Sequence, residues 1–131
     1  MRLKNFSLSF GAQIFKSFSD EARVRILNLL FHHQEMCITD LEHILDFTQT
    51  KTSRHLTYLK NAGIVNSKKL DQWVYYHIKD EAYDIVNQIF EYLNKDNTLI
   101  QDLNTYDVLY SNRELAKNKL DSKWNKHHTK I

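Results

Sequence analysis

Apolar residues recur along the start of the chain at the three- and four-residue spacing of amphipathic helices. One series predicts a helix over roughly 8–18, and its apolar face comprises Phe6, Phe10, Ile14 and Phe18. A second helix follows, because Ser19 or Asp20 can cap its N-terminus. The buried side of this second helix consists of Ala22, Ile26, Leu29 and Leu30. The helical pattern ends at the histidine pair His32 and His33.

A short third helix and a longer fourth helix are predicted on either side of a tight turn. The apolar run 36–38 is too short for a helix. Thr39 followed by Glu42 has the spacing of a capping box, so the third helix is expected to start at Thr39. Its core face comprises Leu41, Ile44 and Leu45. Thr48 can cap the fourth helix, which is expected to run to about Asn61. The positions that face inward on the fourth helix are Thr52, Leu56 and Leu59.

Strand-like and helical patterns alternate after Gly63, which fits the left-handed position that ends a helix. A first strand begins at Ile64 and a second covers 73–78, with a hairpin tip at 69–72. Asp80 then opens a fifth helix. The apolar side of this fifth helix comprises Tyr83, Val86, Ile89, Phe90 and Leu93.

The order of these elements is helix, helix, short strand, helix, turn, helix, hairpin, helix, which is the order of a winged helix-turn-helix. We therefore predict a mainly α fold with a small β-hairpin. Residues 1–94 are expected to form the winged helix-turn-helix domain. The short third helix and the fourth helix, over 48–61, form the helix-turn-helix itself.

Residues 95–131 are expected to form a C-terminal helical extension that ends in a basic tail. A sixth helix is predicted from about 98 to 118. Its apolar stripe is spaced four, three and four residues apart, as in a coiled-coil seam, and comprises Leu99, Leu103, Tyr106 and Tyr110. We expect this stripe to pair with the first helix of a partner subunit and so enlarge a dimer interface. The alternative is that it folds back on the core of its own chain.

Composition narrows the functional classes. The 131 residues are 42% hydrophobic and 26% charged, which is typical of a globular domain. The chain has no proline and only two glycines, so loops that cradle phosphates are nearly excluded. The single cysteine, Cys37, cannot form an internal disulfide or a four-cysteine zinc site. Since we find neither a secretion signal nor a membrane-length apolar run, we expect a cytoplasmic protein.

Positive charge is concentrated in the middle of the chain. Residues 48–73 carry five basic side chains and one acidic side chain, whereas 74–94 carry one basic and four acidic. A solvated charged surface is one interpretation of this stretch. The more specific interpretation is a surface that binds a polyanion.

The outward side of the fourth helix carries polar and basic side chains. With the apolar positions turned inward, the residues rotated outward are Gln49, Thr50, Lys51, Ser53, Arg54, Thr57 and Tyr58. Glutamine and arginine pair bidentately with adenine and guanine edges in the major groove. Threonine, serine and lysine supply phosphate contacts. Lys68 and Lys69 of the hairpin can reach an adjacent phosphate. The pattern predicts a double-stranded DNA partner.

Four segments carry a family likeness, in this order: FSDEARVRILNLL, ITDLEHIL, TQTKTSRHLTYLKNAGIV and WVYYHI. Over residues 12–93 the chain resembles the arsenic-repressor (ArsR-type) family of bacterial transcription regulators. The most specific part is the stretch 53–56, with Leu59 and Gly63 after it. The resemblance implies a homodimer, built through the first and last helices, that represses transcription from a palindromic operator.

Two departures from that family pattern stand out. Glu21 replaces the usual proline near the start of the second helix, and a glutamate still suits a helix N-terminus. Asp71 and Gln72 stand where the hairpin tip often has Gly-Arg. Loss of that arginine removes a groove or phosphate contact, which puts the contribution of the hairpin to DNA binding in doubt.

The metal sites of ArsR-type relatives have no full counterpart here. Of the cysteines that one site type places at the start of the third helix, only Cys37 is retained, and soft metals need two or three thiolates. No histidine occurs between His77 and His127 for the other site type. We predict no metal and no cofactor. The weak candidates that remain are His32, His33 and Cys37, with His127 and His128 in the tail. The alternative is that His32 and His33 meet the helix dipole and Cys37 is a small buried residue.

Two other functional classes compete with a DNA-binding repressor. The weakened hairpin and long extension suit a winged-helix module used for protein–protein contacts. An enzyme is not expected, because no nucleophile–base pair or carboxylate dyad is present. The sequence leaves open the operator, any effector, and the choice between repression and activation.

Overall fold

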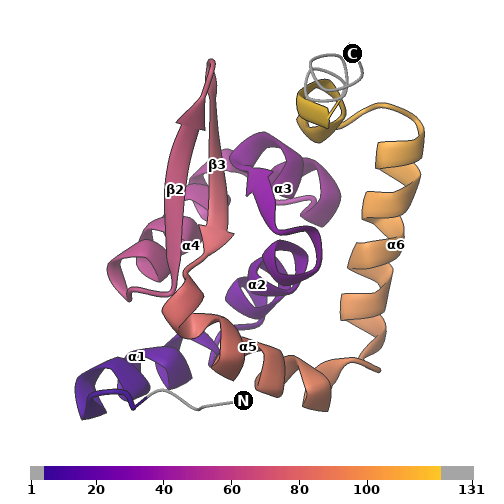
Figure 1. The fold of residues 1–131 in the computed structure, drawn as a ribbon. Coiled ribbons are helices and arrows are strands. Elements are labelled where there is room, and N and C mark those ends of the chain that lie inside the picture. The colour runs from indigo at the N-terminus through magenta and orange to yellow at the C-terminus, as the bar shows by residue number, and fades with distance from the viewer. Residues whose placement is uncertain (1–4, 122–131) are drawn as a thin grey trace, which may run out of the picture.

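The computed structural model describes residues 5–121 and shows a helical body with a small antiparallel sheet (Figure 1). The elements in chain order are α1 (Leu8–Ser17), α2 (Glu21–His33), β1 (Glu35–Cys37), α3 (Ile38–Leu45), α4 (Gln49–Asn61), β2 (Val65–Leu70), β3 (Trp73–Ile78), α5 (Asp80–Leu93) and α6 (Asn97–Ser111). The predicted fold, a winged helix-turn-helix with an additional C-terminal helix, is confirmed. No helix within the described residues is long and apolar enough to cross a membrane.

Local sequence signals set several helix ends. The Asp20 carboxylate accepts a hydrogen bond from the N–H of Ala22 at 2.8 Å, so Asp20, not Ser19, caps α2. The Thr48 hydroxyl accepts one from the N–H of Lys51 at 3.1 Å and caps α4 as predicted. Gly63 follows α4 with a φ of +83°, a conformation that side chains with a Cβ rarely adopt.

The start of α3 differs from the prediction. The capping-box prediction at Thr39 is wrong, because the helix begins at Ile38 and Cys37 occupies the capping position without a side-chain hydrogen bond. Cys37 still pairs with Tyr75 in the sheet, so its backbone is extended up to the first helical residue. The strand therefore passes directly into the helix, and its pairing sets the helix start.

The sheet has three strands in the order β1-β3-β2, both pairs being antiparallel. The short strand expected between the second and third helices is β1, which adds an edge strand to the predicted hairpin, while Ile38 of the apolar run belongs to α3. The hairpin turn consists of Asp71 and Gln72, between β2 and β3. Asp71 has a φ of +55°, the left-handed conformation that tight turns require.

The core is centred on α2. Ile26, Leu27 and Leu29 are fully buried, and side chains from the sheet and the other helices surround them. In Figure 1, α6 stands beside α2 and α3, on the side of the molecule away from the β2–β3 hairpin, and these helices are in contact. The extension therefore belongs to the same hydrophobic core as the domain that precedes it.

The sixth helix is shorter than predicted. It ends at Ser111, and Arg113 takes a φ of +59° that reverses the chain. Leu115 then returns to the core with 2% of its surface exposed, and residues 116–121 form a further helical turn. The prediction of one helix to 118 is wrong because this reversal interrupts it. The part of the predicted tail beyond residue 121 lies outside the described residues.

The apolar stripe of α6 packs on its own chain. Leu99 and Tyr106 are each 6% exposed, and α6 contacts α2 and α3. These two side chains are therefore not available to pair with the first helix of a partner, as the sequence analysis expected. A role of the extension in dimerisation stays a prediction.

Candidate nucleic-acid interface

The N-terminal half of α4 presents a polar surface to solvent. Its exposed side chains are Gln49, Thr50, Ser53 and Arg54, with Thr57 about one turn further along the helix, and the sequence analysis placed all five on the outward side. On the opposite side Thr52, Leu56 and Leu59 are buried, which fixes the rotation of the helix about its axis. The helix carries no acidic side chain. A helix N-terminus with exposed amide, hydroxyl and guanidinium groups is suited to a polyanion with readable base edges.

Lys51 and Tyr58 lie at the borders of this surface and are half-buried. The Nζ atom of Lys51 is 4.1 Å from the centre of the Phe47 ring. The ring of Tyr58 lies under the guanidinium group of Arg23, 4.1 Å from its central carbon. Both predicted contact residues are therefore held by cation–π contacts, each of which fixes the side chain at its position.

Arg23 is a residue of this region that the sequence analysis missed. Its Nη2 atom donates to the carbonyl of Lys16 at 2.8 Å and its Nε atom to that of Ser17 at 3.2 Å. Arg23 thus ties the end of α1 to the C-terminal half of α4. The sequence does contain a signal for this contact, because Arg23 and Arg25 stand among apolar residues of the second helix. When such a helix is buried, its charged side chains need polar partners.

His55 also lies at this surface, but on its buried side, with 6% of its surface exposed. Burial lowers its pKa, and the nearby cations Arg54, Arg23 and Lys51 act in the same direction, against the opposing effect of Asp20. The ring is therefore neutral at neutral pH. His55 contributes packing under the exposed residues of α4, and it adds no charge to the surface.

The two hairpin lysines point to opposite faces of the sheet. Lys69 pairs with Val74 and lies on the face of Ser67, whose hydroxyl accepts a hydrogen bond from Lys60 of α4 at 2.9 Å. Lys68 lies on the other face, because successive strand residues alternate. Its Nζ atom forms an ion pair with Glu35 at 2.9 Å. The structure therefore brings Lys69, but not Lys68, to the side of α4.

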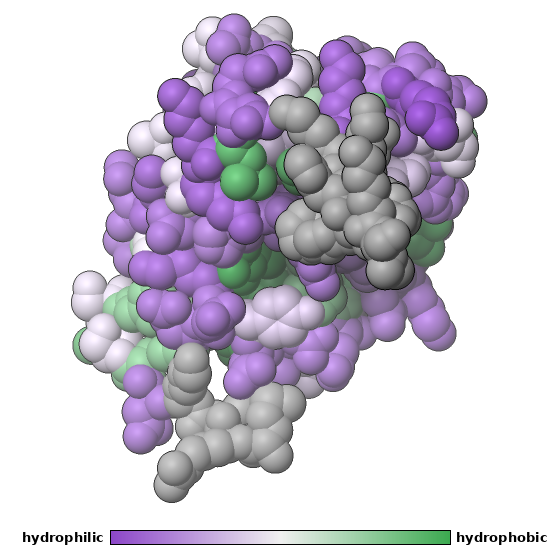
Figure 2. Space-filling model, turned by 45° about the horizontal axis from the view of Figure 1, so that its top comes forward, coloured by the Kyte–Doolittle hydropathy of each residue, from purple (hydrophilic) through white to green (hydrophobic). Residues whose placement is uncertain are grey.

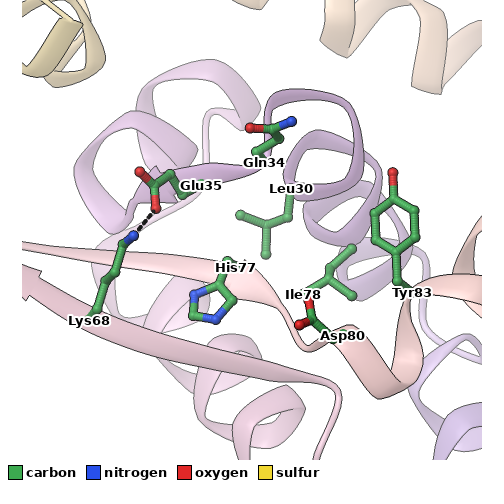
Figure 3. Close-up of a pocket in the computed structure, with 8 residues that line it drawn as sticks. All are labelled: Leu30, Gln34, Glu35, Lys68, His77, Ile78, Asp80 and Tyr83. Carbon is green, nitrogen blue, oxygen red and sulfur yellow. Dashed lines mark ion pairs between the residues drawn. The ribbon is translucent and has the colours of Figure 1, made fainter. Parts of the chain in front are cut away.

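A cavity of about 480 Å³ lies on that second face, between β1, the hairpin and the start of α5. Figure 3 shows the Lys68–Glu35 ion pair at one side, His77 at the centre, and Asp80 and Tyr83 at the other side. The Nδ1 atom of His77 is buried and has no hydrogen-bond partner among the residues described. The cavity is separate from the surface of α4, since the sheet lies between them.

The candidate metal ligands do not converge. His32 is exposed, with Phe31 against its ring edge-on, whereas the ring of His33 stacks on Tyr106 with 3.5 Å between ring centres. Burial lowers the pKa of His33 to about 4. Burial, reinforced by the charge of Asp40, raises the pKa of the Cys37 thiol to about 11, so the thiolate that binds metals is disfavoured.

Within residues 5–121, no group of three histidine, cysteine or acidic side chains is arranged to hold a metal ion. His127 and His128 lie outside the described residues. The alternative interpretation holds for Cys37, which is a buried thiol. It does not hold for His33, because its ring stacks on Tyr106 and its lowered pKa leaves it without the positive charge that would meet the helix dipole.

Comparison with known proteins identifies relatives of this region. A family model described as "Bacterial regulatory protein, arsR family" matches residues 20–67. The arsenical resistance operon repressor of Escherichia coli is 41% identical over 80 residues, which cover 58% of this chain and 68% of that protein. The cadmium resistance transcriptional regulatory protein CadC of Listeria innocua is 40% identical over 79 residues, covering 60% of this chain and 66% of that protein.

The fold has solved counterparts. HlyU from Vibrio cholerae superposes with a TM-score of 0.58 and 26% sequence identity, over 63% of this chain and 90% of that one.

The match to the Listeria regulator covers just under two thirds of its length. The sequence matches include the whole helix-turn-helix, since the family model begins at the cap of α2 and ends within β2. The chain belongs to the ArsR family of regulatory proteins.

Proposed function

We propose that the chain is a sequence-specific DNA-binding transcription regulator, a homodimeric repressor that reads a palindromic operator through α4. The observation that carries the proposal is the exposed polar surface at the N-terminal half of α4, which has no acidic side chain. The relatives named above are transcription regulators, and the one from Escherichia coli is an operon repressor. The function is one of binding, not catalysis, and it places the protein in the cytoplasm with the chromosome.

The residues divide into two roles in this proposal. Gln49 and Arg54 read base edges, because their side chains pair bidentately with adenine and guanine. The residues that hold the phosphate backbone are Thr50, Lys51, Ser53, Thr57 and Tyr58. From the hairpin we assign a phosphate contact to Lys69, since Lys68 is paired with Glu35 on the opposite face.

A second copy of the chain is the proposed partner, and exposed apolar side chains on α1 and α5 support it. Leu8 and Phe15 of α1 are 91% and 75% exposed, and Tyr92 of α5 is 90% exposed. Figure 2 shows hydrophobic side chains gathered at the lower left, the region of α1 in Figure 1. Leu8 and Phe15 are seven residues apart, so they share one face of α1. Exposed apolar residues on one face support an isologous contact.

The test is fluorescence anisotropy with a duplex from the region upstream of the protein's own gene, at two salt concentrations. The Lys51→Ala/Arg54→Ala double variant is compared with a Lys79→Ala/Lys95→Ala control, which removes two positive charges outside the helix-turn-helix and outside the segment 97–121. We expect only the first variant to lose affinity, by roughly 1–3 kcal/mol per lost base contact.

Failure of the wild type to bind any duplex at low salt would reject this function, because even non-specific DNA binding is strong at low salt. That result would favour the winged-helix module that contacts proteins. Equal loss in both double variants would mean that net charge, and not the surface of α4, governs binding.

A further inference from the structure

The segment 97–121, which comprises α6 and the turn 116–121, lies outside the region that the family model matches. It nevertheless reaches the helix-turn-helix at two points, indirectly through Arg25 of α2 and directly at Asp40 of α3. We refer to this segment as the C-terminal clamp. Its two contacts lie near the two ends of α3, the first helix of the helix-turn-helix.

The first contact runs through a partly buried ion pair, in which Asp102 is buried and the Arg25 side chain is 27% exposed. Arg25 of α2 donates from Nε and Nη2 to the two carboxylate oxygens of Asp102, each at 2.9 Å. Asp102 is 3% exposed. The same guanidinium group lies 5.2 Å from the centre of the Phe47 ring, and Lys51 covers that ring as well. Asp102 of α6 is thereby linked through Arg25 and Phe47 to Lys51, in the first turn of α4.

The second contact holds the first turn of α3. The carboxylate of Asp40 accepts hydrogen bonds from the backbone N–H groups of Ala116 at 2.8 Å and Lys117 at 3.0 Å. Asp40 is 2% exposed. Tyr110 donates from its hydroxyl to Asp121 at 2.6 Å and so holds the turn 116–121 against the end of α6.

These contacts matter because α3 has only eight residues, and a helix of that length is not stable by itself. Its position, and that of the turn that leads into α4, depends on what holds its ends. Removing the charge of Asp102 leaves the largely buried Arg25 guanidinium without its partner, so we expect the structure around it to rearrange. A DNA-reading surface must be held within about 0.5 Å of its productive geometry to keep its specificity.

We infer that the C-terminal clamp positions the helix-turn-helix for specific DNA binding, with Asp102 and Asp40 as positioning residues that do not touch DNA. This inference rests on the proposed function. It assigns to the extension a role within each subunit, which the stripe on α6 did not indicate. Networks of this kind change coupled binding by about 0.5–2 kcal/mol, which is roughly 2- to 30-fold in affinity.

The test compares two duplexes of equal length, the region upstream of the protein's own gene and a scrambled version, by fluorescence anisotropy. Asp102→Asn is expected to weaken binding to the first duplex roughly 2- to 30-fold. Binding to the scrambled duplex is expected to stay the same, because the basic surface is unchanged. The matched control is Asp107→Asn, which removes an exposed carboxylate from the same helix and should change neither affinity.

Measurements of the melting temperature distinguish a positioning role of Asp102 from a merely structural one. All variants are assayed well below their melting temperatures, where each is fully folded by circular dichroism. If Asp102 only stabilises the fold, Asp102→Asn lowers the melting temperature but leaves the ratio of the two affinities unchanged. Asp102→Glu retains the carboxylate and should restore part of that ratio, which loss of packing alone would not predict.

Tyr110→Phe provides a second test should Asp102→Asn fail to fold, since it removes only the hydroxyl that holds Asp121. We expect faster hydrogen exchange at the amides of Ala116 and Lys117, together with a smaller ratio of specific to scrambled affinity. If every folded variant of the C-terminal clamp kept an unchanged ratio of specific to scrambled affinity, the inferred positioning role would be wrong. The proposed DNA-binding function would still stand. A wild type that binds neither duplex would reject the proposed function, and the clamp with it.

Discussion

The guanidinium carbon of Arg23 lies 4.1 Å from the centre of the Tyr58 ring, while two nitrogens of the same group donate to the carbonyls of Lys16 and Ser17. One side chain thus joins the last turn of α1 to the outer side of α4. The side chain of Arg23 is 13% exposed, so both its charge and its donors are largely removed from water. The helix that carries the proposed dimer surface and the helix that reads DNA are therefore mechanically connected.

From this relationship we predict that Arg23→Lys destabilises the fold by about 1–2 kcal/mol. Lysine keeps the charge but cannot donate in the geometry of the guanidinium fork, nor stack its plane on the tyrosine. The measurement is the free energy of unfolding from urea denaturation. Tyr58→Phe is the control, because it keeps the ring that Arg23 covers and should cost much less. A loss of similar size in both variants would contradict a role for the stacked ring.

The helices of this fold could be predicted because their signals are local. Asp20 and Thr48 cap helices within three residues of their own position, and Gly63 ends α4 by its own backbone conformation. The start of α3 could not be predicted in the same way. Its first helical residue depends on the pairing of Cys37 with Tyr75, a residue distant in sequence. The capping-box pattern at Thr39 is a local signal that this long-range pairing overrides.

The candidate site could be predicted in part for the same reason. The outward residues of α4 follow from helix periodicity alone, which gives every exposed position on its N-terminal half. Which of two adjacent lysines faces α4 depends on the register of β2 against β3, and the sequence does not fix that register. The reversal after Ser111 also lacks a local signal, since Arg113 adopts its left-handed conformation without the glycine that usually marks one.

The opposite orientations of the two hairpin lysines give a second prediction. Lys69→Ala should weaken binding to specific and scrambled duplexes alike and reduce the slope of log affinity against log salt by about 0.9, because one phosphate contact is lost. Lys68→Ala removes the same charge one residue away and should leave the slope unchanged, since its partner is Glu35 on the far face. The measurement is a salt titration of DNA affinity. The assignment of the hairpin faces would be contradicted if Lys68→Ala changed the slope and Lys69→Ala did not.

A third prediction concerns the stability of the fold below neutral pH. The pKa of His33 is lowered from 6.5 to about 4 by burial against Tyr106, so the folded state disfavours the proton. Below pH 6.5 the unfolded state binds more protons at this position than the folded state does. The free energy of unfolding should therefore fall as the pH drops from 6.5 towards about 4, and His33 should have no effect on its slope above that range.

The control for this pH dependence is His33→Phe, which keeps an aromatic ring against Tyr106 but cannot titrate. Other buried groups contribute to the acid sensitivity of both proteins, so the quantity to compare is the difference in unfolding free energy between wild type and variant at each pH. We expect that difference to be constant above neutral pH and to shift in favour of the variant below pH 6.5. A difference that stays constant down to pH 4.5 would show that His33 titrates normally in the folded protein.

The last prediction tests the dimer surface on α1. Phe15→Glu places a charge on an apolar side chain that is 75% exposed in the single chain and that the proposed dimer buries. Burying an unpaired carboxylate costs several kcal/mol, and a symmetric interface contains the substitution twice. Sedimentation velocity should therefore show a monomer for this variant at a concentration where the wild type is a dimer. Because this side chain is exposed in the single chain, the substitution should leave the monomer folded, with a cooperative melting transition.

Val108→Glu is the matched control for the dimer experiment. Val108 is 59% exposed on α6, so the substitution introduces the same charge at a similar exposure but away from α1. We expect this variant to remain a dimer. Dissociation by Val108→Glu, with Phe15→Glu still dimeric, would move the interface from α1 to the outer face of α6. That outcome would support the predicted dimer role of the extension through its solvent-facing side, since Leu99 and Tyr106 are already buried in their own subunit.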